Sequence, residues 1–222
     1  MKTALQGAAI SLLGIVCFGV ALFWPAGTFD YWQAWMFIGV FVGMSLVSSV
    51  FLAKNPDVLR RRMRGPTAET RPVQKAAATG IYVLFTALLV VSALDRRFGW
   101  SHVPAAVSWC GAALVAIGLG VTLLVVVQNN YAAASVAVED GQKVVSTGLY
   151  GIVRHPMYVG ALVMLVGIPL ALGSFWALAA LLPLPVGLAA RILDEEKALA
   201  DELDGYREYM HDVHYRLVPH VW

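Results

Sequence analysis

Chemically capable side chains gather at the two ends of an apolar stretch near the end of the chain. Arg154, His155 and Tyr158 lie at its start, and Arg191 is followed at its other end by the acidic run 194–196. An arginine is a permanent cation with a fork of donors, whereas carboxylates are anions that accept hydrogen bonds. Brought together, the two groups would hold a ligand with both a negative and a positive charge. The residue types therefore indicate a site for a zwitterion.

Pro156 predicts where the helix of this stretch begins. Proline is well tolerated as a first helical residue because it has no N–H to lose, and it keeps His155 out of the α conformation. Arg154 and His155 then precede a helix N-terminus, whose free N–H groups favour an anion. Gly160, one turn later, leaves a strip of helix open to a flat ligand or to another backbone. Alternatively, Arg154 reaches lipid headgroups, Tyr158 is an interface aromatic and Gly160 packs helices together.

The acidic run predicts that the second helix continues past the apolar residues. Three acids would oppose the helix dipole if the helix ended there, but "ARILDEEKALADEL" goes on with good helix formers. Arg191 and Glu195 are then neighbours one turn apart, and an ordinary pair within the helix is one interpretation, with Glu196 solvated. Ionisable groups this close to an apolar run are also functional candidates, since they are costly at membrane depth.

The elements that position these residues are membrane helices. Hydrophobic residues make up 59% of the chain and charged ones only 14%, which is typical of an integral membrane protein. Each apolar run is close to the length needed to cross a bilayer, and the runs lie at about 7–24, 32–53, 77–94, 104–127, 157–172 and 174–193. The prediction is an all-α, polytopic bundle of about six helices. Its last two form a tight hairpin, 157–193, joined through Gly173 and Ser174, and a cytoplasmic tail helix follows.

Charge sets the expected orientation. Segment 54–75 carries seven Lys or Arg against two acids, so the positive-inside rule makes it cytoplasmic. Both termini then also lie in the cytoplasm, and in a bacterium the protein would lie in the inner membrane. We expect a four-helix membrane region at 1–127 and a catalytic, ligand-binding region at 128–222. A formal charge of +2 is too small to indicate nucleic acid as a partner, so none is expected, whereas membrane lipids are expected partners.

Other signatures of chemistry are weak. The chain has no G-x-G-x-x-G after a strand, no Walker loop and no G-x-S-x-G, which argues against common nucleotide-binding and hydrolase sites. His211 and His214 in "HDVH" are spaced for one face of a helix, but no third ligand converges on them. We therefore predict no metal site.

The C-terminal third of the chain resembles a known superfamily. "VVSTGLYGIVRHPMYVGAL", then "RILDEEKAL" and "GYREYMHDVHYRLVP", resemble the isoprenylcysteine carboxyl methyltransferases and phospholipid methyltransferases, which are integral membrane enzymes. The hallmark R-H-P-x-Y-x-G is complete at 154–160, and the Glu-Glu pair follows at 195–196. The resemblance covers about residues 143–218. "TFDYWQAW" and "RRRMRGPTAE" in the first half are similar to the bacterial branch.

This resemblance implies a methyltransferase that uses S-adenosylmethionine (SAM), bound on the cytosolic side between the hairpin and the tail helix. The catalytic residues would be Arg191, in contact with an acceptor carboxylate, and Glu195, as a base if the acceptor is an amine. The implied cofactor-binding residues are Arg154, His155, Pro156, Tyr158, Gly160, Glu195 and Glu196. The acceptor would be a lipophilic small molecule entering from the bilayer: a prenylcysteine-like carboxylate, a thiol or an amino lipid. The longer stretch 128–148 departs from the prenylcysteine branch, so the sequence leaves the choice among these acceptors open.

Two other classes of function remain. A membrane reductase with a nicotinamide cofactor is one of them, because membrane sterol reductases look like relatives with a similar C-terminal pocket, but a phosphorylated dinucleotide would call for more basic residues there. A non-catalytic transporter or assembly protein would be favoured by matching Gly- or Pro-interrupted helices in both halves. Pro169, Pro183 and Pro185 interrupt the last hairpin, and the first half has no counterpart. The methyltransferase is therefore the favoured prediction, and the sequence makes no prediction of an oligomeric state.

Overall fold

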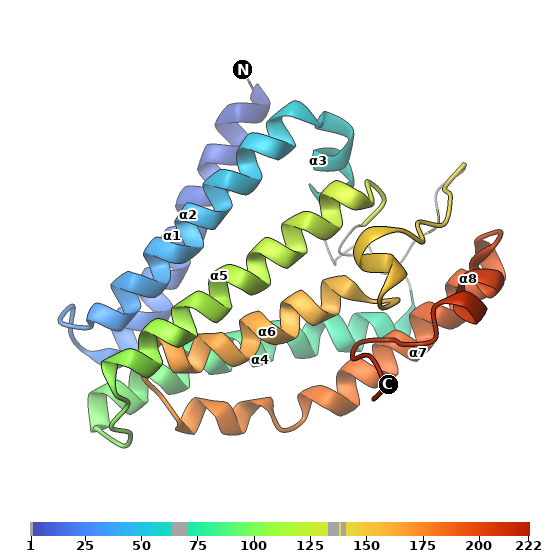
Figure 1. The fold of residues 1–222 in the computed structure, drawn as a ribbon. Coiled ribbons are helices and arrows are strands. Elements are labelled where there is room, and N and C mark those ends of the chain that lie inside the picture. Colours follow the sequence, from blue (N-terminus) through green and yellow to red (C-terminus); the bar gives the residue numbers. More distant parts are fainter. Residues whose placement is uncertain (1, 64–70, 133–137, 139–140) are drawn as a thin grey trace. The chain divides into compact units, whose positions relative to one another are not determined.

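Helices form all the regular secondary structure in the part of the chain that the computed structural model describes. That part is residues 2–63, 71–132, 138 and 141–222, with side chains described from residue 14 onward except that of residue 63. The α-helices are α1 (Lys2–Ala26), α2 (Trp32–Lys54), α3 (Pro56–Met63), α4 (Pro72–Phe98), α5 (Ala105–Gln128), α6 (Pro156–Ala171), α7 (Leu184–Glu202) and α8 (Tyr206–Asp212) (Figure 1). Two short 3₁₀ helices, η2 (Gly148–Gly151) and η3 (Trp176–Leu181), lie among them. The all-α prediction is confirmed.

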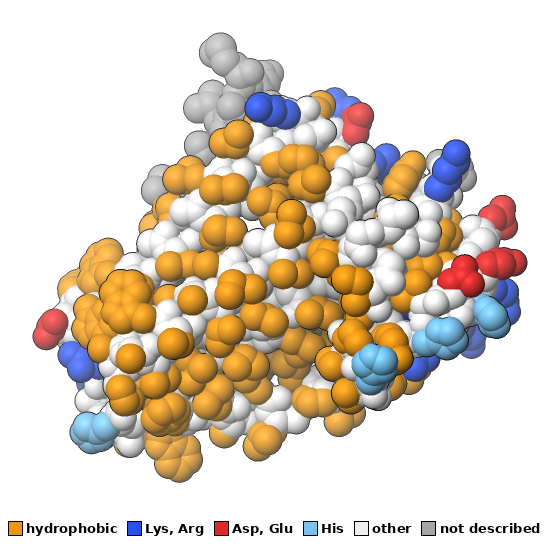
Figure 2. All heavy atoms as spheres, in the orientation of Figure 1, with side chains coloured by type: hydrophobic (Ala, Val, Ile, Leu, Met, Phe, Trp, Pro, Cys, Tyr) orange, Lys and Arg blue, Asp and Glu red, His pale blue; other side chains and the backbone are white. Residues whose placement is uncertain are grey.

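The predicted apolar runs coincide with helices suited to a membrane. Among the described residues, four segments are long and apolar enough to span one, namely Trp32–Lys54, Pro72–Phe98, Ala105–Gln128 and Trp176–Glu202. Two shorter apolar helices are Gly14–Ala26 and Pro156–Ala171. Hydrophobic side chains dominate the face shown in Figure 2, as expected for a surface that meets lipid rather than water. The chain is thus a polytopic helical membrane protein.

Two details of the helices differ from the sequence-based expectation. Segment 56–63, interpreted as part of a basic loop, forms the helix α3, because Pro56 suits a first helical position and the arginines at its end complement the helix dipole. The second arm of the hairpin, expected as one run over 174–193, is instead divided between η3 and α7. Pro183 and Pro185 cause the division, since neither has the N–H that a continuous helix would use. Beyond it, α7 continues to Glu202, as the acidic run predicted.

Contacts divide the chain into two compact units. The first comprises Met1–Leu46, Val83–Ala116 and Met164–Leu182, and the second comprises Val47–Tyr82, Ile117–Val163 and Pro183–Trp222. These units are groupings in space, so the division of function at residue 127 stays a prediction.

A buried carboxylate organises the first unit. Asp95 is 1% exposed and accepts hydrogen bonds from the backbone N–H and the hydroxyl of Ser101, at 2.6 and 2.7 Å, and from the Ser174 hydroxyl, at 2.5 Å. Tyr31, also buried, donates to the Leu172 carbonyl at 2.7 Å. Buried polar groups are stable only when bonded in this way. Asp95 therefore joins the segment after α4 to the turn at Ser174 through hydrogen bonds.

Glycines let α5 and α6 approach closely. In the second unit, a Cβ on Gly160 would lie 2.9 Å from the Gly118 carbonyl oxygen and 3.0 Å from the Thr122 hydroxyl. In the first unit, a Cβ on Gly167 would lie 2.8 Å from the Gly111 carbonyl oxygen. Small residues of this kind allow membrane helices to pack backbone against backbone. The sequence allowed either a flat ligand or another backbone beside Gly160, and in the structure the backbone of α5 lies there.

Candidate functional site

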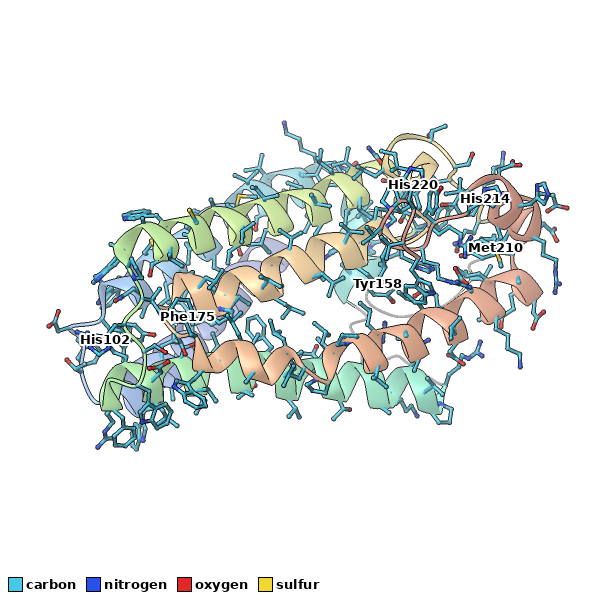
Figure 3. The ribbon with its side chains drawn as sticks, turned by 60° about the horizontal axis from the view of Figure 1, so that its bottom comes forward. His102, Tyr158, Phe175, Met210, His214 and His220 are labelled. Atoms are coloured by element: carbon cyan, nitrogen blue, oxygen red, sulfur yellow. The ribbon has the colours of Figure 1, made fainter. Side chains whose placement is uncertain are left out.

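The residues predicted to do chemistry lie within the second unit, where three segments meet. These segments are the start of α6, the middle of α7 and the tail after α8. Figure 3 shows Tyr158 of α6 at the same end of the unit as Met210 of α8 and His214 and His220 of the tail. As predicted, α6 begins at Pro156, so Arg154 and His155 precede its N-terminus. The local fold thus brings the R-H-P segment and the Glu pair together.

Glu196 is the centre of the site. It is 4% exposed, and its Oε1 accepts from Arg154 Nε at 2.7 Å and lies 3.3 Å from His155 Nε2. Its Oε2 accepts from Arg216 Nε at 2.9 Å. We refer to Arg154, His155, Glu196 and Arg216 as the Glu196 cluster. A buried anion with two guanidinium partners is stably charged, so the interpretation of Glu196 as a solvated residue is wrong.

The tail after α8 returns to the R-H-P segment. The backbone N–H groups of Arg154 and His155 donate to the carbonyls of Tyr215 and Arg216, at 2.8 and 3.0 Å. Arg154 Nη1 also donates to the carbonyls of Val213 and His214, at 2.8 and 3.1 Å. These carbonyls follow the end of α8, where a cation is favourable. Arg154 therefore joins α7, α8 and the tail around the start of α6.

A second chain of hydrogen bonds runs through Tyr158. Its hydroxyl accepts from Arg191 Nε at 2.8 Å and donates to Glu195 Oε2 at 2.5 Å. Glu195 Oε1 lies 3.9 Å from His155 Nδ1, and the His155 and Tyr158 rings stack with centroids 5.6 Å apart. Arg191 is 6% exposed, whereas the Glu195 side chain is 20% exposed. Arg191 and Glu195 are thus more than a surface pair within one helix, because Tyr158 lies between them.

The first turn of α4 is hydrogen-bonded to Arg191 and to Asp194 of α7. Gln74, fully buried, donates from Nε2 to the Arg191 carbonyl at 3.0 Å and to Asp194 Oδ2 at 2.8 Å. Arg191 Nη1 donates in return to the Gln74 carbonyl at 3.4 Å, and Arg71 forms an ion pair of 2.8 Å with Asp194 Oδ1. This network fixes the height and rotation of α7 beside α4. Gln74 Oε1 is buried without a hydrogen-bond partner.

Tyrosines of α8 and of η2 cover the site from the tail side. Burial raises the pKa of Tyr206, and the charges of Glu195 and Glu196 raise it further. Burial also raises the pKa of Tyr209, whose hydroxyl donates to the Tyr150 carbonyl at 2.8 Å. These phenols are neutral at physiological pH, so they add apolar cover and hydrogen-bonding capacity without adding charge.

The charges of the site suit a ligand with both signs. Arg154, Arg191 and Arg216 contribute three positive charges, and Glu195 and Glu196 contribute two negative ones. Cationic donors satisfy a carboxylate, and the partly exposed Glu195 offers an acceptor for an ammonium or sulfonium group. The donor set therefore fits the carboxylate and the two cationic groups of SAM.

The structure brings together most of the predicted site residues. Six of them share the two hydrogen-bond networks: Arg154, His155, Tyr158, Arg191, Glu195 and Glu196. Pro156 is buried as the first residue of α6, and Gly160 lies against α5, so their roles toward a cofactor stay predictions.

Sequence reasoning missed Arg216, Gln74 and Tyr206. The signal for Arg216 was its place in "VHYRLVP", inside the segment that carried the resemblance. His211 and His214 are exposed with ring centroids 6.2 Å apart, and no group of three possible metal ligands occurs among the described side chains.

Comparison with known protein families gives a match over the segment that contains the site. The sequence model of the phospholipid methyltransferase family matches residues 106–203. This segment includes both the R-H-P-x-Y-x-G motif and the Glu pair, and the match confirms the resemblance to the superfamily of membrane methyltransferases. None of the curated proteins compared with the chain matches it. The assignment to the bacterial branch stays a prediction.

Proposed function

We propose, from the match of residues 106–203 to the phospholipid methyltransferase family, that the protein uses SAM to methylate a lipophilic acceptor drawn from the bilayer. The observation that carries this proposal is the placement of the Glu196 cluster and of the Tyr158–Glu195 pair at the start of an apolar helix. A water-soluble, charged cosubstrate and an apolar acceptor can both reach such a place.

The proposed cofactor contacts come from the two networks. Arg154 and the N-terminus of α6 would favour the carboxylate of SAM, and Glu195 would favour its cationic groups. His155, Pro156 and Tyr158 shape the surface around them, Gly160 lets α6 pack closely against α5, and Glu196 holds Arg154 and His155 in place. When bound, SAM supplies a methyl group on a sulfonium, an activated form that needs no metal. The protein's own task is then to align the partners and to exclude water.

Arg191 and Glu195 are the proposed catalytic residues. Arg191 is buried and held by Tyr158 and Gln74, so its guanidinium has a fixed position in which to orient a polar or anionic acceptor headgroup. Glu195 is more exposed and would receive the proton if the acceptor is an amine. A carboxylate or thiolate acceptor would require no such base. An unchanged product yield with an amine acceptor after Glu195→Gln would therefore exclude the role of base.

The proposed orientation places this site at the cytoplasmic face. The basic residues of α3 and of the start of α4 belong to the same unit as the site, and positive segments remain on the cytoplasmic side. The supply of SAM in the cytosol is consistent with this arrangement. Both termini would then be cytoplasmic, in the inner membrane if the source is bacterial.

Transfer of a labelled methyl group tests the proposed activity. The purified protein, reconstituted in lipid vesicles, would be incubated with methyl-tritiated SAM and extracts of prenylated cysteine derivatives, thiols and amino lipids. We expect label in the organic phase, and we expect Arg191→Gln to abolish it while Arg207→Gln, an exposed change on α8, does not. Absence of label with every acceptor class, or oxidation of a nicotinamide cofactor by the same preparation, would overturn the proposal.

A further inference from the structure

The tail after α8 carries an arginine that completes the site from a distant part of the chain. Arg216 lies 20 residues after Glu196 and donates to its Oε2 at 2.9 Å. The backbone of the same segment pairs with the R-H-P segment, since His155 N–H donates to the Arg216 carbonyl at 3.0 Å. One residue of the tail thus contacts the two sequence motifs at once, through its side chain and through its backbone.

The two oxygens of Glu196 divide their partners between the motif and the tail. Oε1 serves Arg154 and His155, whereas Oε2 serves Arg216. Hydrogen bonds at both oxygens fix the orientation of the Glu196 carboxylate. That orientation determines where the Arg154 guanidinium and the His155 imidazole lie. Loss of the Arg216 contact would leave a buried, charged oxygen without this donor and would free the carboxylate to rotate.

Arg216 is itself held in position. Its backbone N–H donates to the Trp222 carbonyl at 2.9 Å, and its Cζ lies 5.1 Å from the centroid of the Trp222 ring. Its side chain is 25% exposed, so it reaches inward from the surface of the tail. Trp222 in turn packs against the apolar cluster of Leu188, Ile192 and Leu217. Hydrogen bonds and packing therefore hold the segment 213–222 in place, with the Arg216 guanidinium against Glu196.

We propose that Arg216 is a positioning residue of the SAM site, acting through Glu196 to fix Arg154 and His155. This inference rests on the proposed function. It assigns to the tail a role that neither the R-H-P motif nor the Glu pair contains, and it does not require that Arg216 touch the ligand. A cation of the same charge and shorter reach should restore part of the effect, because the charge remains while the guanidinium geometry is lost.

Titration calorimetry with S-adenosylhomocysteine in detergent tests the proposal. We expect Arg216→Gln to weaken binding at least tenfold and Arg216→Lys to recover part of that loss. Arg207→Gln is the matched control, because Arg207 forms only an exposed pair with Asp201 and a bond to the Ala200 carbonyl. Equal weakening by Arg207→Gln, or unchanged binding by Arg216→Gln, would overturn the inference.

A double-mutant cycle separates positioning from a general loss of structure. In a Glu196→Gln background, Arg216→Gln should weaken binding much less than in the wild type, because the residue it acts through has already changed. Equal effects in both backgrounds would contradict the inference. If folded wild-type protein binds no S-adenosylhomocysteine, the proposed function fails. The inference then fails with it, whereas wild-type binding that Arg216→Gln leaves unchanged overturns the inference alone.

Discussion

Gly160 lies in the R-H-P-x-Y-x-G motif, and the structure gives it a packing role that a single substitution can test. A Cβ at this position would lie 2.9 Å from the Gly118 carbonyl oxygen and 3.1 Å from Val121 Cγ1, both on α5. The first is backbone, which cannot move aside as a flexible side chain can. Gly160→Ala should therefore push α6 away from α5.

The expected change in the free energy of unfolding of Gly160→Ala combines two opposing contributions. Forcing an extra methyl group into a packed contact typically costs about 1–3 kcal/mol. Replacing glycine by alanine within a helix contributes about 1 kcal/mol in the other direction. Because the clash is with backbone, we expect the upper half of the packing range and a net destabilisation of about 1–2 kcal/mol. Gly80→Ala is the matched control, since Gly80 is exposed on α4 with nothing within 4 Å of the added Cβ, and it should be neutral or stabilising.

Equilibrium unfolding in mixed micelles, followed by circular dichroism, measures both variants. The reasoning requires Gly160→Ala to unfold at a lower denaturant concentration than the wild type and Gly80→Ala not to. A Gly160→Ala variant as stable as Gly80→Ala would show that α5 does not fill the space. If that variant also lost S-adenosylhomocysteine binding, the glycine would be a ligand contact rather than a packing residue.

Two further predictions concern stability. Asp95→Asn should lower the free energy of unfolding by about 2–3 kcal/mol, because buried hydrogen bonds to a charged acceptor are lost. The control is the exposed Asp30→Asn, which should change the free energy of unfolding by less than about 0.5 kcal/mol in the same assay. Equal effects would refute the structural role of Asp95. The raised pKa of Tyr206 stabilises the folded state fully below pH 10, and this advantage falls as the unfolded tyrosine ionises above it. Between pH 10 and 11 the wild type should therefore lose up to about 1.4 kcal/mol more than Tyr206→Phe, and parallel losses would refute the assignment.

Much of the fold could be predicted because a bilayer imposes simple constraints on sequence. Runs of about 20 apolar residues have few alternatives to a helix, since backbone groups need partners in lipid. The start of α6 followed from Pro156, and the continuation of α7 followed from the helix formers after the acidic run. Pro183 and Pro185 were recognised as interruptions of the hairpin, but the boundaries of the run 174–193 were taken from hydropathy alone, so the division into η3 and α7 was not predicted.

The site was predictable only where its residues are close in sequence. Arg154, His155 and Tyr158 lie within five residues, and Glu195 and Glu196 are adjacent, so their types and spacing were visible. Partners from distant segments give no such signal. Gln74 lies in the first turn of α4 and Arg216 lies in the tail after α8, and each becomes part of the site only through tertiary contacts, Gln74 with Arg191 and Arg216 with Glu196. Likewise, the sequence left Gly160 open to a ligand or a backbone, and only the approach of α5 decides between them.

The most direct test of the account is the affinity of the purified protein for S-adenosylhomocysteine, measured by titration calorimetry in detergent. The account predicts saturable binding to the wild type and at least tenfold weaker binding to Glu196→Gln and to His155→Ala. Glu202→Gln, an exposed change at the end of the same helix α7, should bind as the wild type does. Absence of binding in folded wild-type protein, or equal binding by all four proteins, would contradict the central claim that the Glu196 cluster organises a SAM site.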